Sequence, residues 1–231
     1  LVVALVIALS VFLNTFNVYR VSSESMIPAL LPFDYVLVRK IKKNSVQNGA
    51  IACYGKVYII SLPYLDSIKK ECNSLQENSL YVKRIVGLPG DTLQIVNKTL
   101  LVNSLEKLDN KQNMNPNSLD KIRDVYDYGL DYKNYNNITN EDNDNFGPFY
   151  IPHKNHKMEI MDSLFFLYKN IISYEASNNP EIKIYVSDCY TFQNNYYFVL
   201  GDNRNFSIDS RHFGPIPESA IIGEAKYVLF S

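Results

Sequence analysis

Three short segments of this sequence carry the residue types that catalytic sites use. The first holds three serines within four residues, Ser22, Ser23 and Ser25. A serine cluster is usually a turn or a helix cap. Here Pro28 and Pro32 follow it, restrict the backbone and remove two amide donors. A serine held rigidly on such an irregular segment can also act as a nucleophile, so the segment has a structural and a catalytic interpretation.

The second segment, YVKRIVGLPGD at positions 81–91, has the composition of a strand that ends in a Gly/Pro turn. Neighbouring side chains of a strand point to opposite faces, so one of Lys83 and Arg84 should face the apolar interior. Burial disfavours a charged lysine, and lowering its pKa from ~10.4 to about 7 corresponds to roughly 4–5 kcal/mol. Such a lysine can be a general base. On an edge strand, the same pair would be solvated.

The third segment, GDNRNFSIDSRHFGPIP at positions 201–217, follows a strand and is rich in paired charges. Two acids and two arginines can pair and hold a loop rigidly. A Ser-His-Asp triad would need His212, the only nearby histidine, to reach Ser25. Asp202 or Asp209 would then stand behind the histidine. The polar side chains of the segment are Asp202, Arg204, Ser207, Asp209 and Arg211.

Together, and in this order, the three segments resemble the type I signal peptidases. That family carries an S-x-S-M-x-P-T/A-L stretch, here SESMIPAL at positions 23–30. It then carries Y-x-K-R-x-x-G-x-P-G-D, here YVKRIVGLPGD, and G-D-N-R-x-x-S-x-D-S-R, here GDNRNFSIDSR. Glu24 departs from the pattern, because a glycine is common between the two serines.

The resemblance implies a membrane-anchored serine endopeptidase that removes N-terminal signal peptides from exported precursors. It implies that Ser25 is the nucleophile and that Lys83 is the general base. Ser23 would donate its hydroxyl to the oxyanion hole beside the Ser25 backbone N–H, and Ser207 would orient the Lys83 amine. Two supporting ion pairs are implied as well, namely Asp202 with Arg84 and Asp209 with Arg211.

The resemblance also implies the substrate and the location of the enzyme. The precursor should end its signal in an A-x-A-like site. Shallow pockets for its small side chains are expected near Val21, Met26, Leu30 and Val82. The expected location is the bacterial inner (cytoplasmic) membrane, with membrane lipid as a partner and the catalytic domain on the outer side.

No cofactor, metal or nucleic acid is expected. The formal net charge of −1 gives no large electrostatic footprint for nucleic acid. The three cysteines, Cys53, Cys72 and Cys189, show no CxxC spacing and no metal-binding pattern with the histidines. Their odd number leaves open one disulfide with a leftover thiol.

The N-terminal residues 1–19 contain no charge. As a helix they would span about 28 Å, close to the ~30 Å hydrocarbon core of a bilayer. We therefore expect an uncleaved transmembrane helix, with a cleaved signal peptide or a buried helix as alternatives. Because the chain begins with Leu, we expect its natural N-terminus to lie upstream, and flanking charges give no orientation.

Residues 20–231 are expected to form a mostly β catalytic domain of the signal-peptidase type, built from antiparallel strands. Its core would comprise 20–103 and 196–231. The strand-like segments are 34–41, 50–60, 79–103, 196–203 and 220–230, with a turn at VNKT. Residues 104–195 read as a long mixed insertion with loops and little core. Within it, residues 159–176 predict a helix, because Ile160, Leu164, Leu167 and Ile171 recur at helical spacing.

Two other functions fit parts of this pattern. A self-cleaving repressor-type protease also uses a serine and a lysine, but it should carry a DNA-binding region and lack the apolar N-terminal segment. A catalytically silent, membrane-anchored β-scaffold could bind exported proteins, with Glu24 blocking the site. Cleavage of a precursor separates an active peptidase from such a scaffold.

Overall fold

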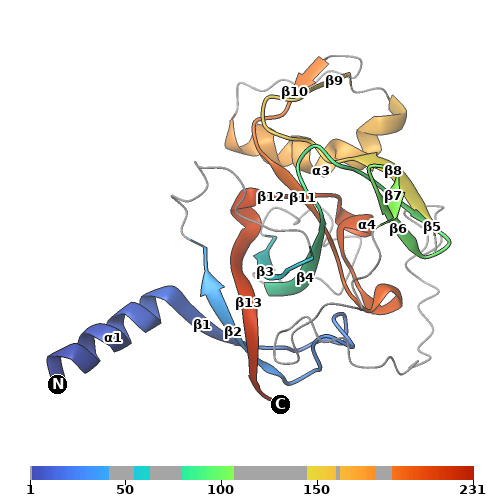
Figure 1. Ribbon diagram of the computed structural model, residues 1–231. Coiled ribbons are helices and arrows are strands. Elements are labelled where there is room, and N and C mark those ends of the chain that lie inside the picture. The colour runs from blue at the N-terminus through green and yellow to red at the C-terminus, as the bar shows by residue number, and fades with distance from the viewer. Residues whose placement is uncertain (1, 42–54, 63–79, 107–144, 160–161, 180–188) are drawn as a thin grey trace.

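Antiparallel β-structure dominates this protein. The computed structural model describes residues 2–41, 55–62, 80–106, 145–159, 162–179 and 189–231 (Figure 1). Every strand pair in these ranges is antiparallel. The mostly β, antiparallel fold expected from the sequence is confirmed. The larger sheet has seven strands in the order β1 (Phe16–Arg20), β2 (Tyr35–Lys40), β13 (Ile221–Phe230), β3 (Val57–Ser61), β4 (Leu80–Gly87), β11 (Tyr196–Leu200) and β12 (Ile216–Pro217).

The predicted strands of the larger sheet lie where their composition placed them. Segment 34–41 contains β2, segment 196–203 contains β11, and segment 220–230 contains β13. All five residues of β11 are buried, as expected for an apolar strand with neighbours on both sides. Segment 50–60 contains the start of β3, and its positions 50–54 lie outside the described residues. Cys53 and Cys72 also lie outside the described residues.

A smaller sheet follows β4 directly along the chain. It has four strands in the order β7 (Leu105–Glu106), β6 (Thr99–Val102), β5 (Thr92–Val96) and β8 (Phe146–Tyr150). Val96 pairs with Thr99, so β5 and β6 form a hairpin with a two-residue loop. Asn97 and Lys98 in this loop have φ of 47° and 69°. Positive φ at both central residues is the signature of a type I′ turn. The predicted turn at VNKT is therefore confirmed.

The N-terminal helix is shorter than the sequence predicted. α1 (Val2–Thr15) has 14 residues, which corresponds to a rise of about 21 Å. Residues 16–19, expected to continue the helix, belong to β1 instead, and Phe16 pairs with Arg39 of β2. The β-branched and aromatic residues of FNVYR favour a strand, and β2 satisfies their backbone groups. Within the described residues, no helix is both long and apolar enough to cross a membrane.

The insertion contributes more to the core than its composition suggested. The expected helix is present as α3 (Asp162–Asn178), with Ile171 fully buried, while the side chains of Ile160, Leu164 and Leu167 lie outside the described residues. In Figure 1, α3 crosses the molecule beneath the pair of β9 (Lys157–Glu159) and β10 (Cys189–Thr191). The prediction of little core is wrong for the described part, which contributes to one cluster the apolar residues Phe146, Phe149, Ile151, Tyr168, Ile171, Ile172, Tyr190 and Phe192. The core residues of the insertion are scattered among many Asn and Asp residues, so the average composition of the segment does not reveal them.

A buried carboxylate fastens α3 to the chain that precedes β11. Glu175 is only 2% exposed. Its carboxylate accepts hydrogen bonds from the hydroxyl groups of Tyr190 (2.6 Å) and Tyr196 (2.8 Å). It also accepts from the backbone N–H groups of Gln193 and Asn194. A buried carboxylate is tolerated when its oxygens are satisfied in this way. Glu175 therefore links the insertion to the strand that leads into the third segment.

Replacing Glu175 with alanine should destabilise the fold. The Glu175→Ala change leaves two tyrosine hydroxyls and two backbone donors without their acceptor, so we expect a loss of about 3 kcal/mol in the free energy of unfolding. Urea unfolding followed by circular dichroism measures it. The matched control is Glu159→Ala, at an exposed position of β9, which should cost less than about 0.5 kcal/mol. Equal losses in the two variants would contradict a structural role for the Glu175 network.

Candidate active site

The larger sheet brings the three segments together. β4 lies between β3 and β11, so the loop that follows β11 starts beside the strand that carries Lys83. The segment 21–34 connects β1 to β2, and Val21, Met26 and Leu30 bury their side chains in one hydrophobic cluster. The two loops then meet, because the Asn203 backbone N–H donates to the Ser25 carbonyl oxygen (3.1 Å).

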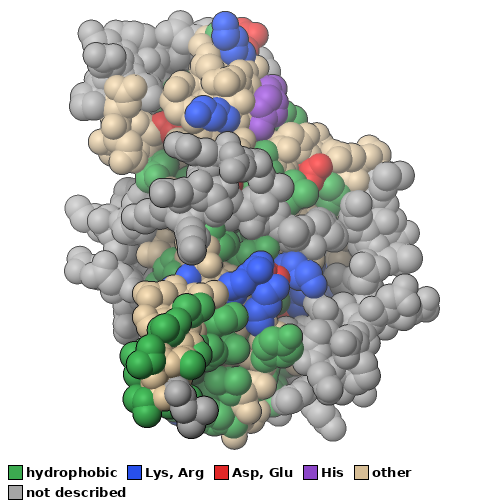
Figure 2. Space-filling view, turned by 60° about the vertical axis from the view of Figure 1, so that its left-hand side comes forward, with side chains coloured by type: hydrophobic (Ala, Val, Ile, Leu, Met, Phe, Trp, Pro, Cys, Tyr) green, Lys and Arg blue, Asp and Glu red, His purple; other side chains and the backbone are tan. Residues whose placement is uncertain are grey.

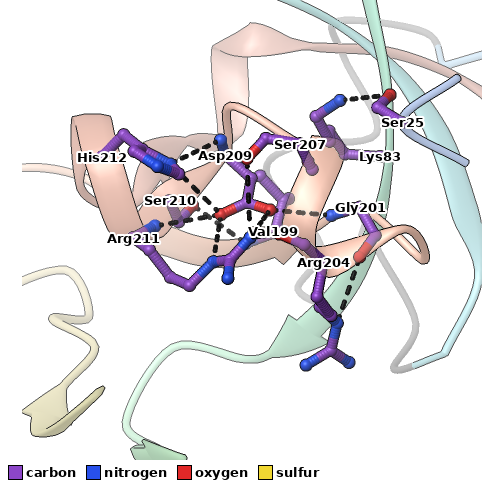
Figure 3. A network of polar contacts seen from close by, with 10 residues as sticks. All are labelled: Ser25, Lys83, Val199, Gly201, Arg204, Ser207, Asp209, Ser210, Arg211 and His212. Carbon is purple, nitrogen blue, oxygen red and sulfur yellow. Dashed lines mark hydrogen bonds and ion pairs between the residues drawn. The ribbon is translucent and has the colours of Figure 1, made fainter. Parts of the chain in front are cut away.

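A serine and a lysine contact each other at this meeting point. Lys83 Nζ donates a hydrogen bond of 2.8 Å to Ser25 Oγ (Figure 3). The two residues are 3% and 5% exposed, respectively. Ser23 Oγ lies 3.2 Å from Ser25 Oγ, while Ser22 is exposed. The cluster of three serines thus contains one residue in contact with a lysine, one beside it and one that faces solvent.

The environment of Lys83 favours its neutral form. Burial lowers the pKa of Lys83 to about 8, and the positive charge of Arg211 acts in the same direction. The negative charges of Asp209 and Asp202 act to raise this pKa, but they do not outweigh burial. Desolvation disfavours the ammonium form because water stabilises a charge far better than apolar side chains do. A lysine with such a pKa has a larger neutral, proton-accepting fraction at neutral pH than a surface lysine, whose pKa lies near ~10.4.

An ion pair anchors the third segment. Asp209 is completely buried, and Arg211 donates to it through Nε (2.9 Å) and Nη2 (3.0 Å). Burial acts to raise the pKa of Asp209, but the charge of the Arg211 guanidinium and its hydrogen bonds hold this pKa well below its usual range. Asp209 also caps the short helix α4 (Ser210–Phe213) and accepts from the Gly201 N–H (3.0 Å). The carboxylate therefore fixes both ends of the loop.

A second ion pair fixes the opposite face of β4. Arg84 Nε donates to Asp202 Oδ1 (2.7 Å), and Arg84 Nη2 donates to Asp202 Oδ2 (2.6 Å). Arg84 Nη1 also donates to the Gly55 carbonyl oxygen. Bidentate pairs of this kind add geometric specificity to the attraction between the charges. Lys83 and Arg84 thus point to opposite faces of β4, as neighbouring residues of a strand do, and Lys83 contacts Ser25 while Arg84 contacts Asp202.

Ser207 and Gly201 pack tightly behind the Ser25 segment. A Cβ atom on Gly201 would lie 2.2 Å from Ser207 Oγ and 2.5 Å from the Ser25 carbonyl oxygen. Only glycine therefore allows this approach. Ser207 Oγ is buried and has no hydrogen-bond partner among the described residues. The hydrogen bond expected between Ser207 and Lys83 is thus not formed in this structure.

The four residues expected to line a substrate pocket belong to one cluster. Met26 and Leu30 are fully buried and Val21 is nearly so, whereas Val82 is partly exposed and packs against the same cluster. The first three therefore form a floor of packed apolar side chains. Val82 is the member that presents apolar surface to the exterior.

His212 has a structural partner in place of Ser25. Its Nδ1 accepts a hydrogen bond from the Asp209 N–H (3.2 Å), which completes the capping box of α4. In Figure 3, His212 lies on the far side of Asp209 from Ser25. The contact made by Ser25 is with Lys83, so this arrangement does not form the Ser-His-Asp alternative. In the described part of the chain, no group of three or more His, Cys, Asp or Glu side chains could hold a metal ion. Cys189 is a free thiol.

Three positions matter to this geometry that we did not single out from the sequence. Gly201 permits the close approach of the loop, and Ser210 Oγ accepts a hydrogen bond from the Val199 N–H (3.0 Å). Asn203 holds the Ser25 segment. All three lie within or beside the GDNR and DSR stretches. The only sequence signal for these positions is that they lie among the charged residues of the third segment. That signal does not predict the contact between Asn203 and Glu24, which are some 180 residues apart.

Adding a methyl group at Gly201 should displace the Ser25 segment. The Gly201→Ala side chain meets Ser207 and the Ser25 backbone, so we expect a loss of about 1–3 kcal/mol in unfolding free energy. Reaction of Ser25 with a serine-directed fluorophosphonate, followed by mass spectrometry, should also slow. The control is Asn205→Ala, an exposed position in the same loop. Labelling of Gly201→Ala at the wild-type rate would show that the close packing is dispensable.

The sequence of this chain is similar to those of bacterial signal peptidases. The model of the family "Signal peptidase, peptidase S26" matches residues 1–230. The chain is 28% identical over 226 residues to a signal peptidase I of Buchnera aphidicola subsp. Baizongia pistaciae, with coverage of 91% of this chain and 68% of the relative. It is 26% identical over 231 residues to signal peptidase I P of Bacillus subtilis subsp. natto, which covers 100% of this chain and 85% of the relative.

Two further similarities come from other bacteria. Signal peptidase IB of Staphylococcus aureus is 26% identical over 214 residues, covering 90% of this chain and 75% of the relative. The crystal structure of a signal peptidase I from Enterococcus faecalis V583 is 22% identical, with a TM-score of 0.32 and coverage of 76% of this chain and 98% of that chain. The match of the family over nearly the whole chain decides the assignment. This chain belongs to the signal peptidase family, peptidase S26, and is a serine endopeptidase.

Proposed function

We propose that this protein removes N-terminal signal peptides from exported precursor proteins, with Ser25 as the nucleophile and Lys83 as the general base. Membership of the signal peptidase family supports the substrate class. The observation that carries the proposal is the 2.8 Å hydrogen bond between Lys83 Nζ and Ser25 Oγ in a buried site. A serine hydroxyl is a weak nucleophile until a nearby base takes its proton.

The contact between Ser25 and Lys83 supports the following acylation step. Neutral Lys83 takes the proton of Ser25 as Oγ attacks the scissile carbonyl carbon of the precursor. The developing oxyanion receives hydrogen bonds from the Ser25 N–H and the Ser23 hydroxyl, since Ser23 Oγ lies only 3.2 Å from the nucleophile. The C–N bond then breaks, and protonated Lys83 gives its proton to the leaving amine. The products of this step are the mature N-terminus and an acyl-enzyme on Ser25.

Deacylation uses the same lysine. Lys83, neutral again, takes a proton from water, and the hydroxide attacks the ester carbon of the acyl-enzyme. The Ser25–acyl bond breaks, and Ser25 recovers its proton from Lys83. Ser207 is suited to orient the amine during these transfers, because its buried hydroxyl has no hydrogen-bond partner among the described residues and is available to the amine. Asp209–Arg211 and Asp202–Arg84 hold the loop and the strand in place.

The precursor binds in extended form beside β4. β3 pairs with β4 from Leu80 to Arg84, whereas β11 pairs with it only from Arg84 onward. Among the described residues, Val82 and Lys83 therefore have no strand partner on the β11 side. A substrate strand added there presents its backbone to β4, which is the general mode of β-augmentation. Val82, over the floor formed by Val21, Met26 and Leu30, then accepts the small side chains of an A-x-A-like site.

An apolar face next to this site supports membrane association. The sheet register places Val18, Leu37 and Tyr227 side by side across β1, β2 and β13. The next row carries Arg20, Tyr35 and Phe230, with the Tyr35 and Phe230 rings stacked 4.4 Å apart. Val18, Tyr227 and Phe230 are each at least half exposed. The apolar side chains of α1, which leads into β1, are exposed as well.

Basic side chains border this apolar face. Arg39 and Lys226 both contact Glu224, and Lys40 lies at the end of β2. Figure 2 shows hydrophobic side chains gathered below a group of Lys and Arg side chains. Apolar surface bordered by cations suits the boundary between acyl chains and anionic headgroups. We infer that α1 and this face attach the protein to the bacterial inner membrane, with the catalytic site on its outer side and close to the embedded signal.

The serine and the lysine can each be tested by substitution. Ser25→Ala removes the nucleophile and Lys83→Ala removes the base, so each should lower kcat for a secretory precursor in detergent by about 10³-fold or more. Ser22→Ala and Lys154→Ala change exposed residues of the same types and should retain wild-type activity. The measurement is the rate at which the mature protein appears on a gel.

Two results would contradict this proposal in different ways. Processing at the wild-type rate by Ser25→Ala or Lys83→Ala would exclude the serine–lysine mechanism. Binding of the precursor by the wild-type protein without any product would instead favour the catalytically silent β-scaffold, with Glu24 blocking the site.

A further inference from the structure

Asn203 contacts the Ser25 segment through two separate donors. Its side-chain Nδ2 donates to the Glu24 carbonyl oxygen (3.1 Å), and its backbone N–H donates to the Ser25 carbonyl oxygen (3.1 Å). The Ile27 N–H also donates to the Glu24 carbonyl oxygen (3.1 Å). The Glu24 carbonyl therefore accepts one hydrogen bond from its own turn and one from the opposite loop. Its direction is fixed from both sides.

The Glu24 carbonyl shares a peptide plane with the Ser25 N–H. The Glu24–Ser25 bond is trans, so its C=O and N–H groups point in opposite directions within one rigid plane. Holding the carbonyl oxygen therefore also sets the direction of the N–H. A hydrogen bond accepted by the carbonyl further polarises the amide and strengthens its N–H as a donor.

Asn203 can act as a fixed support because its own loop is anchored. The Gly201 N–H donates to buried Asp209, and Arg204 Nε donates to the Gly201 carbonyl oxygen (3.1 Å). Arg211 Nη2 closes the loop by donating to the Arg204 carbonyl oxygen (2.6 Å). These contacts connect the backbone around Asn203 to the Asp209–Arg211 pair. The position of Asn203 therefore does not depend on the hydrogen bond of its side chain alone.

We propose that Asn203 is a positioning residue for the oxyanion hole, which it serves by holding the far end of the Glu24–Ser25 amide. This inference rests on the proposed function, in which the Ser25 N–H stabilises the oxyanion. The amide orientation exists before substrate binds, so the donor needs no rearrangement as charge develops. Preorganised donors of this kind stabilise the transition state more than the bound substrate. Asn203 should therefore affect kcat and leave KM nearly unchanged.

The first test is the kinetics of Asn203→Ala on a secretory precursor. Removing an oxyanion donor outright costs about 10²–10³-fold in kcat, and loosening one should cost about 10-fold. Asn203→Asp keeps the shape but places an acceptor against the Glu24 carbonyl, so its loss should be at least as large. Asn205→Ala, an exposed asparagine two residues away, is the matched control and should keep the wild-type kcat.

A pair of inhibitors separates this role from a general loss of structure. A peptide aldehyde with an A-x-A-like end adds Ser25 Oγ to its carbonyl carbon, and the resulting hemiacetal oxygen occupies the oxyanion site. The matching peptide alcohol binds the same pockets but cannot form this adduct. Asn203→Ala should weaken the aldehyde by about 10-fold and leave the binding of the alcohol unchanged.

The outcomes distinguish this inference from the proposed function. A kcat within twofold of wild type for Asn203→Ala, or equal weakening of aldehyde and alcohol, would overturn the role of Asn203. If Ser25→Ala remained fully active, the proposed function itself would fail. Loss of activity in Ser25→Ala together with unchanged kinetics in Asn203→Ala would overturn only the positioning role.

Discussion

In the proposed mechanism Lys83 must lose its proton, although two carboxylates lie close enough to stabilise its charged form. Burial supplies the driving force, because an ammonium group without water is costly. Asp209 and Asp202 oppose it, since each raises the pKa of Lys83. Each carboxylate, however, has an arginine of its own: Arg211 binds Asp209, and Arg84 binds Asp202. Arg211 also lowers the pKa of Lys83 directly, so with burial it outweighs the two carboxylates and the pKa falls to about 8.

Three parts of the fold hold Ser25 and Lys83 in contact: β4, the loop after β11 and the Ser25 segment. β4 carries Lys83 and Arg84 on opposite faces, so a single strand positions Lys83 against Ser25 and anchors one ion pair. The loop after β11 is clamped by Asp209 and approaches Ser25 closely because Gly201 has no side chain. The Ser25 segment buries Met26 and Leu30 in the core, which keeps its turn in place. Asn203 then joins the loop to this turn. Each part restrains another, so the contact between Ser25 and Lys83 does not depend on one element.

Sequence patterns predicted the local features and missed the non-local ones. Strand composition and the VNKT turn were sufficient for β2, β11, β13 and the β5–β6 hairpin, because these depend on neighbouring residues. The helix end at Thr15 was not predictable, since β1 forms through pairing with β2 across a gap in the chain. The core of the insertion was missed for a similar reason. Aromatic residues such as Phe149 and Phe192 are far apart in the sequence and form a core only through their packing in the folded chain. At the site, motif residues marked the segments, but the roles of Gly201 and Asn203 depend on a contact between distant loops.

The protonation state of Lys83 tests the central claim most directly. Selective labelling of lysine side chains with ¹³C allows the Cε signal of Lys83 to be followed against pH by NMR, with Lys83→Arg to assign it. The account predicts a midpoint of about 8 for Lys83, while exposed lysines titrate near ~10.4. The amine would then be protonated below that midpoint and able to accept the Ser25 proton above it. A midpoint near ~10.4 for Lys83 itself would contradict the account, because almost none of the amine would then be neutral at pH 7, whereas a midpoint of about 8 leaves about a tenth of it neutral.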